Sequence, residues 1–77
     1  MPKYTDQELI TAFTGKPIAG QKRWEACFTP RGNAISQRDN DTIKTFSALN
    51  RIEAQQMATE YGMRILEARV RWIYMAK

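Results

Sequence analysis

Five arginines are the residues of this chain whose type and spacing suggest a binding chemistry. Arg23, Arg69 and Arg71 fall in segments with strand-like alternation. Arg31 and Arg38 fall in the turn region that follows the segment containing Arg23. A guanidinium group presents several N–H donors and pairs well with carboxylates and phosphates. We therefore predict that Arg23, Arg31, Arg38, Arg69 and Arg71 bind a partner, from an open sheet face and its hairpin.

The balance of charges fits an acidic partner. The chain has 12 Lys and Arg against 8 Asp and Glu, a formal net charge of +4. A polarised basic surface attracts acidic proteins or a phosphate backbone. The alternative is a solvated sheet face on which Arg23 pairs across strands with Glu67, and Glu25 with Arg69. Because Glu25 and Glu67 interrupt the basic stripe, both interpretations stay open.

Four aromatic residues, Trp24, Phe28, Trp72 and Tyr74, offer a second chemistry. Exposed aromatic rings on a sheet stack on the bases of single-stranded nucleic acids. Here, however, the aromatic residues share the apolar phase of the alternation, and the arginines take the other phase. We therefore expect the aromatic side chains in the core.

The sequence offers few residues of the types that catalysis or metal binding requires. The chain has no histidine and a single cysteine, Cys27, so imidazole catalysis, an internal disulfide and a thiolate zinc site are excluded. Asp39-Asn40-Asp41 lacks the Gly and Glu of an EF-hand loop and is expected to be a solvated turn. Nor is there a glycine-rich phosphate loop. We predict no enzymatic activity, no cofactor and no metal site.

The elements that would position these residues begin with a short helix. Thr5 is a good N-cap, and Glu8 completes a capping box with it. Gly15 is placed to end the helix. The sequence therefore predicts a helix over about residues 5–14.

Two strands are predicted next. Residues 22–29 alternate with period two, and residues 30–33 have the composition of a turn. The limits of the second strand are open: Ala34–Ser36 could begin it, and Thr42–Phe46 is its more β-prone half, with a loop or bulge between them.

The remainder of the chain is predicted as a helix and a strand. The helix has Ser47 or Asn50 as its cap and closes at Gly62 in a left-handed conformation. A strand over about residues 66–74 follows, because β-branched and aromatic residues favour extended structure. The rival is one helix from Asn50 to Lys77, which would make the protein mainly α.

Together these elements predict a single α+β domain over residues 1–77. A short N-terminal helix precedes a β-β-α-β core over about residues 22–75, which makes an α-β-β-α-β order. A right-handed crossover gives the strand order 2-1-3, with one helix packed on the sheet. The predicted core pairs strand residues with helix residues: Trp24, Ala26, Phe28, Val70 and Trp72 against Met57, Ala58 and Tyr61.

The second half of this pattern resembles a known class of small proteins. The segment from Thr45 through Ala58 and Gly62 to Val70 is similar to the strand–helix–Gly–strand half of small phage and mobile-element proteins with a β-β-α-β core. These include anti-CRISPR inhibitors and phage inhibitors of host RNA polymerase. The resemblance covers residues 24–72 at most and transfers no site residue. It implies a non-catalytic inhibitor that docks on a host complex, often near its nucleic-acid channel.

We therefore expect a small, non-enzymatic, phage-encoded or mobile-element-encoded protein that inhibits a larger host protein or ribonucleoprotein complex. The alternative is a basic accessory protein that binds nucleic acid directly. The longest apolar run is too short for a membrane span, and a lone cysteine without an apolar N-terminal segment favours the cytoplasm. The open sheet edges would also allow two copies to pair as a homodimer.

Overall fold

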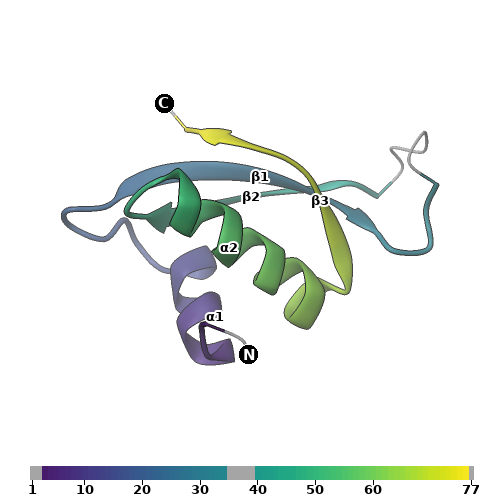
Figure 1. The fold of residues 1–77 in the computed structure, drawn as a ribbon, viewed down its shortest axis with the longest axis horizontal. Coiled ribbons are helices and arrows are strands. Elements are labelled where there is room, and N and C mark those ends of the chain that lie inside the picture. The colour runs from purple at the N-terminus through teal and green to yellow at the C-terminus, as the bar shows by residue number, and fades with distance from the viewer. Residues whose placement is uncertain (1–2, 35–39, 77) are drawn as a thin grey trace.

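A three-stranded antiparallel sheet organises the protein, and both helices lie on the same side of it (Figure 1). The computed structural model describes residues 3–34 and 40–76. The strand order is β2-β1-β3, as predicted. In chain order the elements are α1 (Asp6–Thr14), β1 (Lys22–Pro30), β2 (Thr42–Ala48), α2 (Arg51–Tyr61), a π-helical turn η1 (Gly62–Leu66) and β3 (Ala68–Met75).

The start of α1 follows from local chemistry. Thr5 Oγ1 accepts a hydrogen bond from the Glu8 N–H at 3.1 Å, and the Glu8 carboxylate accepts one from the Thr5 N–H at 2.9 Å. This capping box satisfies two N–H groups that the first helical turn leaves without partners. These hydrogen bonds also lower the pKa of Glu8 below its usual value.

An aromatic cluster joins the helices to the sheet. The Phe13 ring of α1 stacks between Phe46 of β2, at 4.3 Å between ring centroids, and Tyr61 of α2, at 3.9 Å. Phe28 of β1 contacts both Phe13 and Tyr61 in tilted geometry. Burial of these rings on one side of the sheet removes apolar area from water and so stabilises the contact between helices and sheet.

The second helix begins as predicted but ends differently. Asn50 caps α2 by accepting a hydrogen bond from the Glu53 N–H at 2.9 Å, whereas Ser47 is buried within β2. Gly62 is right-handed, with φ −60° and ψ −47°, so the predicted left-handed closure at this residue is wrong. The helix continues as η1, and the left-handed residue that ends it is Glu67, with φ 53°.

Gly62 is required by close packing instead. A Cβ atom there would lie 2.8 Å from the Ala68 carbonyl oxygen and 3.1 Å from the Phe28 ring. The absence of a side chain lets the last turn approach the sheet and lets the chain reverse into β3. The rival single helix over residues 50–77 is therefore wrong, since residues 68–75 pair with β1.

A β-bulge interrupts the pairing of β1 with β3. Phe28 lies opposite Val70 and Cys27 lies opposite Trp72, so Arg71 is an extra residue in β3. A bulge of this kind shifts the alternation of every residue that follows it. Trp72 is consequently not on the helix-packed face, and its predicted place in the core is wrong. Ile73 takes that place, opposite Ala26, and is buried.

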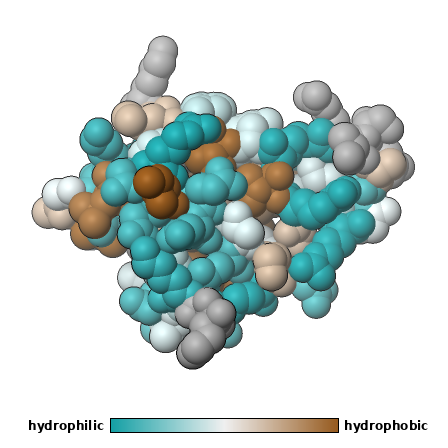
Figure 2. Space-filling model, in the orientation of Figure 1, coloured by the Kyte–Doolittle hydropathy of each residue, from teal (hydrophilic) through white to brown (hydrophobic). Residues whose placement is uncertain are grey.

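The second strand is confirmed over its β-prone half and extends to Ala48. Ala34 belongs to neither strand, and the predicted loop over residues 37–41 lies largely outside the described residues. Neither helix within the described part of the chain is long and apolar enough to cross a bilayer. In the orientation of Figure 2, hydrophilic side chains predominate and hydrophobic ones show as separate small groups.

Candidate functional site

The sheet face opposite the helices is the candidate functional site, and we call it the open face. Residues paired across antiparallel strands share a face, so the register assigns its side chains. One row across the three strands consists of Ile43, Cys27 and Trp72. The next row consists of Thr45, Glu25 and Tyr74. The open face comprises Arg23, Glu25, Cys27 and Thr29 of β1; Ile43, Thr45 and Ser47 of β2; and Arg69, Arg71, Trp72 and Tyr74 of β3.

An aromatic pair lies on the edge strand β3 of this face. The rings of Trp72 and Tyr74 stack with 4.8 Å between centroids and 21° between planes. Tyr74 is 50% exposed, and Ile43 in the neighbouring row is 58% exposed. Trp72 and Tyr74 were expected in the core, and the bulge at Arg71 is the physical reason that they are not. The register places both rings on the face that carries the arginines, with Tyr74 exposed and Trp72 partly buried.

Glu25 contacts the aromatic pair. A hydrogen bond from the Tyr74 hydroxyl to the Glu25 carboxylate raises the pKa of Tyr74, because a phenolate would lose this bond and repel the carboxylate. The predicted ion pairs of Glu25 with Arg69 and of Arg23 with Glu67 are wrong in register. Glu25 lies opposite Tyr74, and Arg69 lies opposite Thr29.

Arg71 is anchored on both sides. Its Nε donates to Thr29 Oγ1 at 2.9 Å and lies 3.0 Å from Asp41 Oδ2, and only 16% of its side chain is exposed. Cys27 Sγ lies 3.8 Å from the same carboxylate oxygen. Asp41, expected in a solvated turn, is therefore a half-buried ion-pair partner that fixes the bulge.

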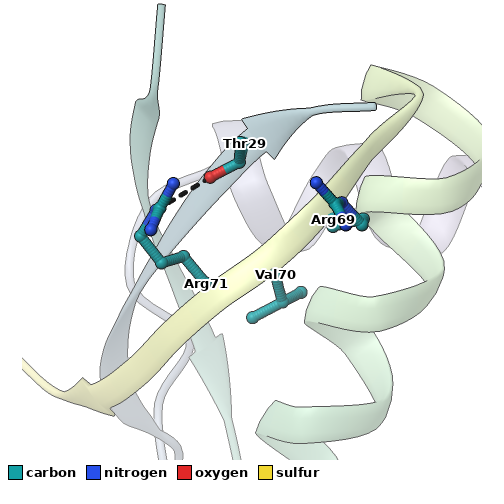
Figure 3. A pocket seen from close by; sticks show the side chains of 4 residues that line it. All are labelled: Thr29, Arg69, Val70 and Arg71. Atoms are coloured by element: carbon teal, nitrogen blue, oxygen red, sulfur yellow. Dashed lines mark hydrogen bonds between the residues drawn. The ribbon is translucent and has the colours of Figure 1, made fainter. Parts of the chain in front are cut away.

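A hollow of about 330 Å³ lies beside the bulge, lined by Thr29, Arg69, Val70 and Arg71 (Figure 3). Arg71 reaches across from β3 to Thr29 on β1, while Val70 points toward α2. Arg69 is exposed, and its Nη2 donates to the Asn33 carbonyl oxygen at 2.9 Å. The guanidinium groups of Arg69 and Arg71 therefore flank one opening in the surface.

The other predicted arginines are dispersed. Arg23 lies near the opposite end of β1, where its Nη1 donates to Ser47 Oγ at 2.7 Å. Six residues separate it from Thr29, which corresponds to about 20 Å along an extended strand. Arg31 is exposed just beyond β1, and its N–H bonds to the Glu67 carbonyl oxygen at 3.4 Å. Arg38 lies outside the described residues.

The described residues contain no group of three or more His, Cys, Asp or Glu side chains that could hold a metal ion. Comparison of this chain with protein-family models, curated proteins and solved structures finds no match. Its function must therefore be inferred from the chemistry of the open face itself.

Proposed function

We propose that the protein is a non-enzymatic binding protein that holds single-stranded nucleic acid on its open face. The observation that carries this proposal is the stacked Trp72–Tyr74 pair, which lies on the same face as Arg69 and Arg71. Unstacked bases bind exposed aromatic rings, and sheets with aromatic residues on an open face are a recurrent platform for such binding. The outer surfaces of the paired rings are the expected stacking sites.

The charge of the face favours stacking over bulk electrostatic attraction. Among the described residues, Arg23, Arg69 and Arg71 contribute three positive charges to this face, while Glu25 and the Arg71-bound Asp41 contribute two negative charges, which leaves +1. Counterion release contributes about 0.7 to the log–log salt slope per phosphate contact on a single strand. We therefore expect a shallow slope of about one unit, which corresponds to one or two phosphates.

The direct test is fluorescence anisotropy with a labelled, unstructured oligonucleotide. Each base stacked on an aromatic ring is worth about 1–3 kcal/mol, so Trp72→Ala and Tyr74→Ala should each weaken binding by about 5- to 150-fold. A duplex of the same sequence should bind more weakly, because its bases are already stacked on one another.

Ile52→Ala is the matched control. Ile52 is an exposed apolar residue, 71% accessible, on α2 and off the open face, so its loss should leave affinity unchanged. Circular dichroism would show that all three variants keep the wild-type fold. Equal affinities of the Trp72 and Ile52 variants, or no binding at low salt, would rule out nucleic acid as the ligand of this face.

A second candidate is docking on a host protein or ribonucleoprotein complex, the inhibitory role that the phage-protein resemblance implies. Glu25 favours it, because a carboxylate beside Tyr74 repels phosphate but can pair with a basic protein surface. Trp, Tyr and Arg are also the residues that most often dominate protein interfaces. Glu25→Gln separates the candidates: it should strengthen oligonucleotide binding, whereas it should weaken a nuclease-resistant protein complex captured from bacterial lysate.

Arg69 is a better position than Arg71 for a charge-reversal variant that tests either candidate. Arg71 is paired with Asp41 and would leave a half-buried carboxylate without its partner if reversed. Reversal of Arg69 alone is therefore the cleaner probe, because Arg69 forms no ion pair with any described residue.

A further inference from the structure

We propose that the hollow lined by Thr29, Arg69, Val70 and Arg71 is a phosphate-binding subsite of the open face. This inference rests on the proposed binding of single-stranded nucleic acid and assigns a phosphate group of that ligand to the hollow. The volume of about 330 Å³ exceeds that of a phosphate group and accommodates part of the attached sugar as well.

The first argument is that both guanidinium groups are held in position before a ligand arrives. Arg71 is fixed through Nε by Thr29 and Asp41, and Arg69 is fixed through Nη2 by the Asn33 carbonyl oxygen. Side chains that are already ordered lose little conformational entropy on binding. The contact with Asn33 occupies one of the five N–H donors of Arg69, and planar guanidinium groups match the oxygen atoms of phosphate.

The second argument is the local charge. Arg69 and Arg71 contribute two positive charges, and Asp41 cancels one of them through its ion pair with Arg71. Arg69 forms no ion pair with a described residue, and its single positive charge equals in magnitude the negative charge of a phosphodiester. Asp41 is not among the residues that line the hollow, and its carboxylate contacts Arg71 at Nε.

The third argument is the position of the hollow relative to the aromatic pair. The bulge places Arg71 and Trp72, which are consecutive in sequence, on the same face. Arg71 and the opening therefore lie on the same face as Trp72, where they are available to the backbone of a strand whose base stacks on that ring. Sequence neighbours on a regular strand would point to opposite faces, so the bulge creates this juxtaposition.

The phosphate could be an internal phosphodiester or a terminal phosphomonoester, and these two sources are distinguishable. The experiment compares three oligonucleotides of one sequence, with a 5′ phosphate, with a 3′ phosphate and with neither, on wild type and on Arg69→Gln. If the phosphate is internal, Arg69→Gln should weaken all three to the same extent, by about fivefold, and lower the salt slope by about 0.7. If it is terminal, one phosphorylated oligonucleotide should bind wild type more tightly than the other two, and Arg69→Gln should remove that advantage.

Two arginine variants serve as controls. Arg51→Gln removes an exposed charge from α2, and Arg23→Gln removes one from the far end of the open face. Neither variant should remove the tighter binding of one phosphorylated oligonucleotide, as Arg69→Gln is expected to do. If Arg69→Gln matches Arg51→Gln on all three oligonucleotides while Trp72→Ala still weakens binding, the subsite is overturned and the proposed function stands.

Inorganic phosphate provides a readout that does not depend on oligonucleotide binding. Its titration, followed by NMR, should give saturable shifts at Thr29, Arg69 and Arg71 in the wild type and lose them in Arg69→Gln. These shifts would support the subsite even if no oligonucleotide bound. The absence of oligonucleotide binding would then refute the proposed function alone. If inorganic phosphate gives no saturable shift and Arg69→Gln has no effect on the oligonucleotides, the subsite is refuted.

Discussion

Single side chains decide what the open face can bind, and Tyr74 with Glu25 is the clearest case. The Tyr74 hydroxyl bonds to the Glu25 carboxylate, and the Tyr74 ring stacks beside Trp72. The same bond makes the protonated phenol the favoured state. The phenol therefore stays neutral to a higher pH than an ordinary tyrosine does.

The hydrogen bond predicts a measurable titration. The pKa of Tyr74 should lie above the ordinary value of 10.0, and Glu25→Gln should lower it toward that value. Because the folded pKa is raised, this bond contributes stability that is complete below pH ~10 and is lost as pH rises through the folded pKa. The measurement is the ultraviolet absorbance of tyrosinate against pH, with Tyr74→Phe to identify the titrating group. An unchanged titration curve in Glu25→Gln would contradict the assignment.

At the scale of helices and strands, the boundaries set by interactions between residues close in sequence were predictable. The capping box of Thr5 and Glu8 and the alternation of residues 22–29 both involve near neighbours in sequence, and α1 and β1 follow them closely. The phase of β3 was not predictable in the same way. Residues 72–75 are all apolar, so alternation alone cannot say which of them face the helices.

Pairing with β1 supplies the missing information. The extra residue Arg71 is accommodated because Asp41 and Thr29 bind its Nε, and neither contact can be read from the sequence around Arg71. Sequence reasoning therefore placed Arg69 and Arg71 on the open face but assigned Trp72 to the core. The candidate site needed the long-range contacts of the bulge to be recognised.

Gly62→Ala tests the close approach of η1 to the sheet, because the substitution should lower rather than raise the free energy of unfolding. In an ordinary helix Gly→Ala stabilises by about 1 kcal/mol. At Gly62 the new methyl group would lie 2.8 Å from the Ala68 carbonyl oxygen, and such overpacking costs about 1–3 kcal/mol. Because backbone atoms cannot yield as a flexible side chain does, we expect Gly62→Ala to lower the free energy of unfolding in urea.

Gly32→Ala is the control for this substitution. A Cβ atom at Gly32 meets nothing within 4 Å, and its backbone is not left-handed. Its free energy of unfolding should stay within about 1 kcal/mol of the wild-type value. If Gly62→Ala stabilised the protein, the close approach of η1 to the sheet would not be the reason for glycine at this position.

The molecule as a whole has two sides with different roles. On the helix side, Lys3 and Tyr4 are tied to α2: Lys3 Nζ lies 2.8 Å from Glu53 Oε1, and the Tyr4 hydroxyl also bonds to Glu53. Arg64 joins this network through Asp6 and Glu60. These polar groups largely satisfy one another across α1, α2 and η1, whereas the proposed ligand-binding chemistry lies on the open face.

The measurement that tests this account most directly is an NMR map of backbone amides during titration with an unstructured single-stranded oligonucleotide. The account predicts that shifts concentrate on the open-face residues of β1 and β3, with the largest at Trp72, Tyr74 and Arg69, and that α1 and α2 change little. Shifts confined to the helices, or no shifts at low salt, would contradict it.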